Sequence, residues 1–444
     1  MANTTRSSGG DRRPALRAVR IVRASDRDAV AALLDRRPAR NPEVERTVAE
    51  ILKRVRREGD SAVARYARRL DRLKGPIEVS RREMREGSRD VDERVKQAIR
   101  TAADHIRRVA ERQIPRGWSI SPAPGVRISQ RVTPLDRVGC YVPGGRYPLP
   151  SSLLMTAIPA VVAGVPEVIA SCPRPDATVL YAALEAGVSR LFRIGGAHAI
   201  AAMAFGTASI PPVDKIVGPG NAYVAAAKAQ IAAECGIDFF AGPSEIAVVS
   251  ETGIPAWIAA DLVAQAEHDP DARAILFTPS RALAEAVAAE IERQLTRIAA
   301  AAPAMARNGG IVLTRTLDEA VMLSQRLAPE HVVCDSDAVA ARLTRAGTVF
   351  VGRFSAQACG DYVTGSNHVL PTSGAAAARG GLSAADFVRV SSVQRLTAAG
   401  VRRIGPAAVA LAEAEGLVGH ADSVRLRLEA PRRPGGVRGR GEQP

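Results

Sequence analysis

The most constraining feature of the chain is a repeated alternation of short apolar runs, breaks at glycine or proline, and alanine-rich helical stretches. Between about residues 140 and 245 it reads EVIASCPRP then ATVLYAALEAG, LFRIGG then AHAIAAMAFG, and DKIVGPG then NAYVAAAKAQIAAE. Strand, loop and helix in series are typical of a parallel sheet whose strands are joined by crossover helices. The sequence therefore predicts an α/β fold.

The same alternation returns after residue 245, where helical stretches separate five short apolar runs: IAVVS, AILFTP, GGIVLT, HVVCD and TVFVG. The pattern predicts two α/β units, the first of which is inserted between a helical N-terminal part and the second. A chain of 444 residues, 46% of them hydrophobic, is long enough for more than one buried core. Length and composition therefore agree with this division.

Segments outside the alternating regions follow other patterns. From Val30 to Glu111, charged segments carry apolar residues at helical spacing, so this part is predicted to be helical. From Trp118 to Tyr141, alternating and β-branched residues broken by proline and glycine predict paired strands that lead to a tight loop. A boundary is expected near residue 140. The C-terminal GPAAVALAEAEGLVGHADSVRLRL predicts a helix followed by a short extension.

A net charge of +15 would suit a nucleic-acid-binding protein, but most of that charge lies at the two ends. Residues 1–40 carry ten arginines against four aspartates, and residues 431–444 carry four arginines against one glutamate. Both ends are rich in glycine, proline or serine and are predicted to be disordered. Aromatic residues make up only 4% of the chain and do not interleave with the basic runs, so no specific nucleic-acid partner is expected.

The five cysteines, at 140, 172, 235, 334 and 359, are odd in number and form no CxxC pair. This pattern argues against a disulfide framework and against a thiolate zinc site, and predicts reduced core residues. No apolar run approaches the length that spans a bilayer, and the N-terminus lacks the apolar segment of a secretory signal. We therefore expect a soluble, cytoplasmic protein with no membrane partner.

One predicted helix departs from the apolar pattern at its end. Ile258, Leu262 and Gln265 fall on one stripe, so a glutamine stands where a core leucine is expected. His268 lies one turn further along, and Asp269-Pro270 ends the helix. Two polar groups near one point are compatible with a hydrogen-bonded helix end or with a metal site, and the residues alone leave both readings open.

Loops that follow the predicted strands are candidate binding sites, because ligands of parallel α/β sheets bind beyond the carboxyl ends of the strands. In IVGPGN, residues 216–221, two glycines let the backbone approach a ligand, and Asn221 can cap the next helix or contact something bound. IGGAHAI, residues 194–200, repeats the theme with His198 at the start of a helix. Neither loop is GxGxxG, so the loops alone do not establish a dinucleotide site.

The segment RLAPEHVVC, residues 326–334, places Glu330 and His331 together after Pro329, at the entry to an apolar strand. Successive side chains of a regular strand point to opposite faces, so only an irregular backbone lets both reach one pocket. A carboxylate beside an imidazole suits two distinct proton transfers. The alternative is a surface glutamate beside a half-buried histidine.

Two more segments carry candidate polar residues. ACGDYVTGSNHVLPT places Asp361 in a turn-rich stretch, and EGLVGHADS provides Glu415 and His420 near the end of the chain. These residues can equally form an Asx-turn and a helix cap. His105 lies in mid-helix among arginines and is expected to be solvated.

The ordered series of these motifs resembles the histidinol dehydrogenase family from about Ile21 to Arg427. The matching stretches, in the family's order, are YVPGG, VDKIVGPGN, AGPSE, QAEH, APEH, GDYVTGSNHVLPT, GGLSAADFVR and EGLVGHADSV. The resemblance implies oxidation of L-histidinol to L-histidine with two NAD, the last steps of histidine biosynthesis. It also implies two Rossmann-like parallel-sheet units of the aldehyde-dehydrogenase type, with helical N- and C-terminal extensions.

The resemblance further implies one zinc per subunit, with Gln265, His268, Asp361 and His420 as ligands. His420 and Glu415 are expected to come from the partner subunit of an intertwined homodimer. A mixed set of nitrogen and oxygen ligands suits zinc. The implied substrate contacts are Ser244, Gln265, His268, His331, Asp361, Glu415 and His420.

In the mechanism that the resemblance implies, His331 is the base for the hydroxyl proton and again for the aldehyde hydrate, while Glu330 activates the water. Zinc orients the imidazole and amine of the substrate. Tyr141, His198 and Asn221 match positions that contact NAD. Position 198 is commonly glutamine in the family, so His198 is a departure from the usual pattern.

The expected divisions of the chain follow from both arguments. They are a disordered basic tail (1–20), an N-terminal helical part with the first portion of α/β unit 1 (21–140), an inserted NAD-binding Rossmann-like unit (141–245), the remainder of α/β unit 1 with the zinc and catalytic residues (246–382), a C-terminal dimerisation extension (383–430) and a second disordered basic tail (431–444). The main alternative function is a paralogous zinc- and NAD-dependent dehydrogenase of another small polar alcohol or diol, and the alternative from another class is a basic nucleic-acid-binding protein.

Overall fold

A computed structural model describes residues 19–35, 41–144, 148–240 and 242–429 of the chain. The chain divides into two compact units. The first unit comprises the described residues up to Gln113 together with Leu135–Phe387, and the second comprises Ile114–Pro134 and the described residues from Val388 onward. The predicted disordered tails, 1–20 and 431–444, lie outside the described residues except for Val19 and Arg20.

The first sheet of the first unit is parallel throughout, with the order β1-β12-β11-β10-β13-β14. Its strands are β1 (Ile21–Arg23), β10 (Glu245–Val249), β11 (Arg273–Thr278), β12 (Gly310–Leu313), β13 (His331–Cys334) and β14 (Thr348–Val351). Every residue of β10 is buried, as expected for a parallel strand that is covered on both faces.

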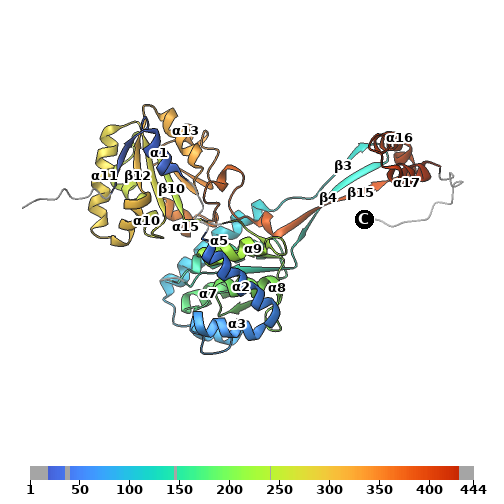
Figure 1. Ribbon diagram of the computed structural model, residues 1–444, viewed down its shortest axis with the longest axis horizontal. Coiled ribbons are helices and arrows are strands. Elements are labelled where there is room, and N and C mark those ends of the chain that lie inside the picture. Colours follow the sequence, from blue (N-terminus) through green and yellow to red (C-terminus); the bar gives the residue numbers. More distant parts are fainter. Residues whose placement is uncertain (1–18, 36–40, 145–147, 241, 430–444) are drawn as a thin grey trace, which may run out of the picture. The chain divides into compact units, whose positions relative to one another are not determined.

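Helices cover both faces of this sheet (Figure 1). Ile246 and Val248 share a core with one set of helices, while Ala247 and Val249 share a core with the other, because successive side chains of a strand point to opposite faces. The first set is α10 (Pro255–Ala266), α11 (Arg281–Leu295) and α12 (Ala302–Asn308), and the second is α1 (Arg27–Leu34), α13 (Leu317–Leu327) and α14 (Asp337–Ala340).

The second sheet has the order β2-β7-β6-β5-β8-β9, and only its edge strand β2 is antiparallel. Its strands are β2 (Glu78–Val79), β5 (Arg137–Tyr141), β6 (Glu167–Ser171), β7 (Arg190–Phe192), β8 (Lys215–Val217) and β9 (Gly236–Ile237). Among the five parallel strands, the first in sequence is central, with the second and third on one side and the fourth and fifth on the other. This is the strand order of dinucleotide-binding folds.

The N-terminal helices belong with the second sheet, which differs from the expected assignment of 21–140 to the other α/β unit. The apolar stripe of α2, with Val48 and Ile51, shares a core with Phe192 and Ile200. Only β1 and α1 join the first sheet. The helices around the second sheet are α2 (Pro42–Glu58), α3 (Asp60–Tyr66), the π-helix η1 (Ala67–Asp71), α4 (Arg81–Gly87), α5 (Glu93–Gln113), α6 (Pro150–Val162), α7 (Ala177–Glu185), α8 (Gly196–Phe205) and α9 (Ala222–Ile231).

The second unit is a three-stranded antiparallel sheet followed by two helices. It comprises β3 (Trp118–Ala123), β4 (Val126–Pro134), β15 (Val388–Leu396), α16 (Ala398–Ala414) and α17 (Val418–Leu428). The predicted paired strands therefore end at Pro134, and the predicted C-terminal helix with a short extension is a pair of helices. At the hairpin turn, Gly125 has a φ of +80°, and a Cβ there would lie 2.5 Å from the Thr397 hydroxyl, so only glycine fits.

The remaining short elements are α15 (Gln357–Tyr362), η2 (Ala299–Ala301), η3 (Ala375–Ala377) and η4 (Ala384–Phe387). All five cysteines are free and four are buried, but Cys359 is exposed, which corrects the prediction of five core cysteines. None of the helices in the described ranges is both long and apolar enough to cross a membrane.

Candidate active site

Glu330 and His331 lie together at the amino end of β13, and both are buried. Helix α13 ends at Leu327, and the next residue, Ala328, has a φ of +40° and a ψ of 63° that turn the chain sharply before the strand begins. This irregular backbone lets neighbouring side chains share one site, with His331 Nδ1 3.7 Å from Glu330 Oε2. The backbone before β13 is thus irregular, as the sequence analysis required if both side chains were to reach one pocket. The alternative of a surface glutamate is wrong.

The surroundings of Glu330 favour its neutral form. Burial raises the pKa of the Glu330 carboxyl to about 7, although the nearby charge of His331 and the hydrogen bond from Glu245 N act in the opposite direction. That backbone N–H donates to Glu330 Oε2 at 3.0 Å, and the Ser244 side chain also hydrogen-bonds to Glu330. A carboxyl that titrates near neutrality can accept a proton and return it.

The imidazole of His331 is held between two partners. Its Nδ1 lies 3.3 Å from the Glu245 carbonyl oxygen, and its Nε2 lies 3.5 Å from Asp361 Oδ1. Burial opposes the charged imidazolium, but the charges of Glu330 and Asp361 outweigh burial and raise the pKa of His331. When Nδ1 donates to the carbonyl, Nε2 is free to accept a proton, and Asp361 stabilises the cation that forms.

Asp361, on α15, is positioned by two residues that the sequence did not single out for this role. Gln357 Nε2 donates to Asp361 Oδ2 at 2.6 Å, and His368 Nδ1 lies 2.8 Å from the Asp361 carbonyl oxygen. Burial opposes the charge of Asp361, but its contacts with His331 hold the pKa of the carboxyl below its usual value. Burial also lowers the pKa of His368, so this imidazole is neutral. Gln357 stands four residues before Asp361 on α15, a spacing that could have signalled the first contact, whereas the contact of His368 depends on how the loop after α15 folds back.

Gln265 and His268 stand at the end of α10, as the sequence predicts. The helix ends at Ala266, so His268 lies just beyond it and is exposed, while Gln265 is buried. The Gln265 side-chain oxygen is buried and has no hydrogen-bond partner among the described residues. A buried amide oxygen without a partner is costly, and a bound cation would satisfy it. The donor chemistry at this helix end therefore fits a metal ligand better than a cap.

Ser244 and His331 both stand at the amino ends of parallel strands, since Ser244 precedes β10 and Ile246 of that strand pairs with His331. Helix α10 follows β10 and precedes β11, so its C-terminal end returns to the same edge. The expectation that ligand-binding loops follow the carboxyl ends of strands is therefore wrong for this site. The reason is that the acid–base pair sits on the backbone entering β13.

The residues expected to contact NAD lie at the carboxyl ends of the second sheet, as the sequence predicts. Tyr141 ends β5, and its hydroxyl accepts a hydrogen bond from Gly196 N at 3.0 Å. Burial raises the pKa of Tyr141 to about 12. Asn221 caps α9 by accepting from Tyr223 N and Val224 N at 3.1 and 3.2 Å.

His198 is buried and its ring is engaged on one side only. Its Nε2 lies 2.8 Å from Asp71 Oδ2, the same oxygen that accepts a hydrogen bond from Gly195 N at 3.0 Å. The ring stacks on Tyr66 with 5.7 Å between centroids, and its Nδ1 is buried without a hydrogen-bond partner among the described residues. Asp71 thus fixes both the imidazole and the glycine loop, a role the sequence did not reveal.

A buried ion pair shapes the other glycine loop. Lys228 and Asp238 are both buried and paired, Lys228 Nζ donates to the Gly218 carbonyl at 2.9 Å, and Asp238 Oδ2 accepts from Gly218 N at 2.8 Å. Gly218 has a φ of +119°, and a Cβ there would lie 2.1 Å from the Tyr141 carbonyl oxygen. Only glycine with this clamp lets the loop approach the end of β5 so closely.

Glu415 and His420 lie in the second unit, at the end of α16 and in α17, and both are exposed. The first unit therefore contributes Gln265, His268 and Asp361 to the expected ligand set. Within the described residues, no three His, Cys, Asp or Glu side chains gather as a metal site.

His105 corrects one expectation outright. It is half-buried rather than fully solvated, and its Nδ1 lies 2.6 Å from the Val363 carbonyl oxygen, in the segment that follows α15. The surrounding arginines of α5 suggested exposure, but the residue contacts the segment just after the helix that carries Asp361.

Two parallel sheets, one of them with the strand order of dinucleotide-binding folds, together with a buried carboxylate–imidazole pair, place the chain among α/β oxidoreductases. The family profile described as histidinol dehydrogenase matches residues 34–428. Histidinol dehydrogenase from Geobacter sulfurreducens is 44% identical over 414 residues, covering 90% of this chain and 96% of that protein. The enzyme of that name from Dechloromonas aromatica is 43% identical over 430 residues, covering 94% and 99%.

The fold agrees with these sequence relatives. The crystal structure of histidinol dehydrogenase from Elizabethkingia anophelis is similar with a TM-score of 0.88 and 32% identity, covering 93% of this chain and 98% of that one. The chain belongs to the histidinol dehydrogenase family.

Proposed function

We propose that the protein oxidises L-histidinol through the aldehyde to L-histidine, with two NAD as hydride acceptors, in histidine biosynthesis. The observation that carries the proposal is the buried Glu330–His331 pair beside Asp361, in a member of this family. Two successive oxidations need a base for an alcohol and then a water activated for attack on an aldehyde. This pair supplies two proton acceptors in one site.

In the first oxidation, His331 takes the hydroxyl proton while the carbon loses a hydride to NAD. Its Nε2 faces Asp361, which stabilises the imidazolium. In the second oxidation, Glu330 takes a proton from water as the water oxygen bonds to the aldehyde carbon, and the aldehyde oxygen takes the proton that His331 gained in the first oxidation, which gives the hydrate. His331 then accepts the proton of the hydrate as a second hydride leaves to a second NAD. Each oxidation thus removes two electrons, and the two together release the acid.

Gln265, His268 and Asp361 would hold zinc, with His420 of the partner subunit as the fourth protein ligand. When bound, zinc would orient the imidazole and amine of the substrate. Support comes from the buried, unpartnered oxygen of Gln265 and from Gln357 and His368, which fix the side chain and the backbone of Asp361. Such outer contacts commonly orient metal ligands.

NAD would bind at the carboxyl ends of the second sheet, where Tyr141 ends β5, His198 lies in the first turn of α8 and Asn221 caps α9. His198 in place of the common glutamine keeps one ring nitrogen free. Because Asp71 accepts the Nε2 proton, Nδ1 would be a hydrogen-bond acceptor toward the dinucleotide.

A homodimer would complete the site, with Glu415 and His420 crossing to the other subunit. Support comes from the second unit, in which only Val126, Gly400, Gly405 and Ala421 are buried among the described residues. Nine of its large apolar side chains are exposed, and such surfaces mark protein interfaces. They are Trp118, Ile120, Val390, Leu396, Ile404, Leu411, Leu417, Val418 and Leu426.

Substrate identity separates this proposal from a paralogue that oxidises another small polar alcohol. The test is steady-state turnover of L-histidinol and of a panel of polar alcohols and diols by the purified protein. We expect the highest kcat/KM for L-histidinol by at least about a hundredfold, because a site that holds an imidazole and an amine rejects substrates that lack them. Faster turnover of another alcohol would assign the chain to the paralogue.

A further inference from the structure

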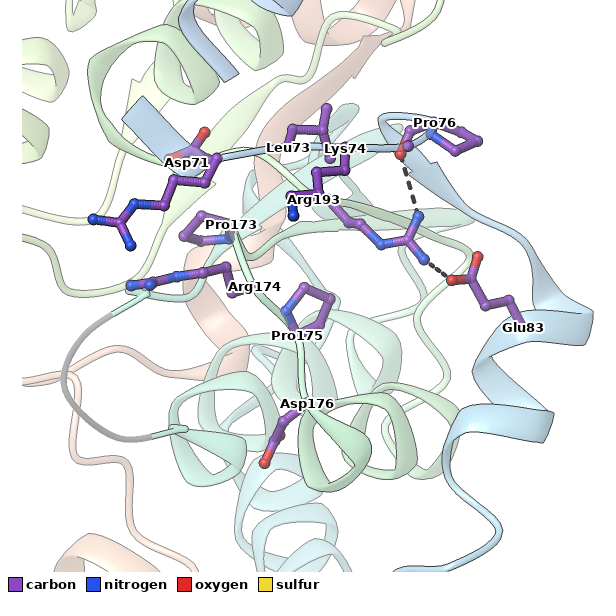
Figure 2. A pocket seen from close by; sticks show the side chains of 12 residues that line it. Asp71, Leu73, Lys74, Pro76, Glu83, Pro173, Arg174, Pro175, Asp176 and Arg193 are labelled. Carbon is purple, nitrogen blue, oxygen red and sulfur yellow. Dashed lines mark hydrogen bonds and ion pairs between the residues drawn. The ribbon is translucent and has the colours of Figure 1, made fainter. Parts of the chain in front are cut away.

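A cavity of about 510 Å³ opens at the carboxyl edge of the second sheet. Four segments line it: residues 71–76 from the end of η1 onward, Glu83 of α4, residues 173–176 after β6, and Arg193 after β7 (Figure 2). It adjoins the loops expected to bind NAD, because Asp71 lines it and also holds His198 and Gly195. None of the motifs of the candidate active site accounts for this cavity.

The strand order shows which part of a dinucleotide would reach the cavity. In folds of this order, the adenosine ribose lies beyond the end of the second strand, where an acidic residue hydrogen-bonds to its 2′-hydroxyl. Here the second strand is β6, and the residues that follow it are Cys172, Pro173 and Arg174. An arginine therefore stands near the place where an NAD-selective site carries a carboxylate, and an arginine there accommodates a 2′-phosphate.

The acidic residues of the lining are already engaged. Asp71 accepts from Gly195 N and pairs with His198. Glu83 forms an ion pair with Arg193, and Figure 2 shows Arg193 turned toward it. Asp176 caps α7 by accepting from Val179 N at 2.9 Å. Each carboxylate of the lining is thus already engaged by a partner within the protein.

Three basic residues of the lining remain available. Arg174 is exposed and extends away from Arg193 (Figure 2), and its only hydrogen bond to a described residue is a 3.3 Å contact with the Gly144 carbonyl oxygen. Arg72 and Lys74 line the same cavity and form no ion pair with any described residue. A guanidinium with two basic neighbours is a recognised arrangement for phosphate.

We infer that this cavity binds the adenosine end of the dinucleotide and that Arg174 admits a phosphate on its ribose, so that the protein accepts NADP as well as NAD. The inference rests on the proposed function for the location of the dinucleotide. It goes beyond that function in assigning the cofactor specificity to Arg174.

The test is calorimetric titration of the full chain with 2′,5′-ADP and with ADP, which differ only in the 2′-phosphate. We expect 2′,5′-ADP to bind at least as tightly as ADP. Arg174→Ala should weaken 2′,5′-ADP about tenfold, the effect of losing one charge-assisted hydrogen bond, while ADP changes less than about twofold. Arg174→Lys keeps the charge and should retain most of the affinity. The control is Arg315→Ala, which removes the same charge from an exposed position in the loop between β12 and α13.

Three results would overturn the inference. They are tighter binding of ADP than of 2′,5′-ADP, an equal loss of affinity for both ligands in Arg174→Ala, and binding of neither ligand. Because binding is read without turnover, its outcome is separate from that of the proposed function. A protein that binds 2′,5′-ADP through Arg174 but does not oxidise L-histidinol would contradict the function alone. Oxidation of L-histidinol with NAD, with no affinity for the 2′-phosphate, would contradict the inference alone.

Discussion

At the scale of single residues, Glu330 and His331 have neighbouring positions but different surroundings. His331 faces a carbonyl oxygen and a carboxylate, which favour its protonated form, while burial favours the protonated form of Glu330. Both groups can therefore hold a proton that they have taken. The different roles proposed for the two residues in the two oxidations follow from the groups that each side chain faces.

Replacing Glu330 by glutamine keeps the shape of the side chain and removes the base. Glu330→Gln should slow oxidation of the aldehyde by about a hundredfold or more, the usual effect of a lost general base, and slow oxidation of the alcohol far less. Rapid-quench assays that start from L-histidinol and from L-histidinal separate the two steps. His331→Asn is the matched comparison and should slow both. An equal loss in both steps for Glu330→Gln would remove the proposed assignment.

The titration of Glu330 predicts the direction in which the rate of aldehyde oxidation changes with pH. Its pKa of about 7 means that the carboxylate, the form that accepts a proton, is present above that pH and is lost as the pH falls through it. Oxidation of the aldehyde by the wild type should therefore fall about tenfold from pH 8 to pH 6 through Glu330 alone. This loss should be absent in Glu330→Gln. A pH profile unchanged by the substitution would show that the rate does not depend on this carboxyl.

Raising the pKa of a buried carboxyl also affects stability. The folded chain holds the proton more tightly than the unfolded chain, so ionisation above pH 7 costs up to about 3 kcal/mol of folding free energy. Glu330→Gln should accordingly raise the melting temperature at pH 8 and change it little at pH 4, where the carboxyl is protonated in the folded chain and mostly protonated in the unfolded chain.

At the scale of elements, the sequence predicted well whatever depends on local pattern. The strand–loop–helix alternation predicted both sheets, and the polar end of α10 predicted where Gln265 stands. Prediction from the sequence failed where the structure depends on contacts between residues that are far apart in the chain. The apolar stripe of α2 shows only that the helix is buried, not that Phe192 of the second sheet covers it. Likewise, nothing local to Asp71 or His368 indicates the groups that they contact.

The loop between β8 and α9 provides a prediction at this scale. Lys228→Met leaves the buried carboxylate of Asp238 without its partner and should cost about 3–5 kcal/mol. Because the pair holds Gly218 by both its N–H and its carbonyl, the KM for NAD should rise at least about tenfold more than the KM for L-histidinol. Chemical unfolding and two-substrate kinetics measure the two effects. Arg281→Met, which removes an exposed ion pair with Glu285, is the control and should cost less than about 1 kcal/mol. An equal rise in both KM values would make the clamp merely structural.

At the scale of the whole molecule, the second unit does not bury its own apolar surface. The expected ligand set also has His420 in this unit and three ligands in the other. Both observations suit a site completed by a second copy of the chain, and an isologous dimer would contain two such sites.

Mixed variants test the shared site. His268→Ala and His420→Ala chains should each be nearly inactive, because each lacks one ligand in both sites of its dimer. Unfolded together and reassembled, about half the dimers should be hybrids with one intact site, so activity should return toward about a quarter of the wild-type value. If both ligands of a site came from one chain, no hybrid would contain an intact site and mixing would restore nothing.

The most direct measurement of the central claim is the amount of NADH formed for each L-histidinol consumed. The claim is that one site carries out two successive oxidations because Glu330 and His331 stand together beside Asp361. We predict a ratio of about two, with L-histidine as the product and no accumulation of the aldehyde. A ratio near one with the aldehyde released would contradict the account.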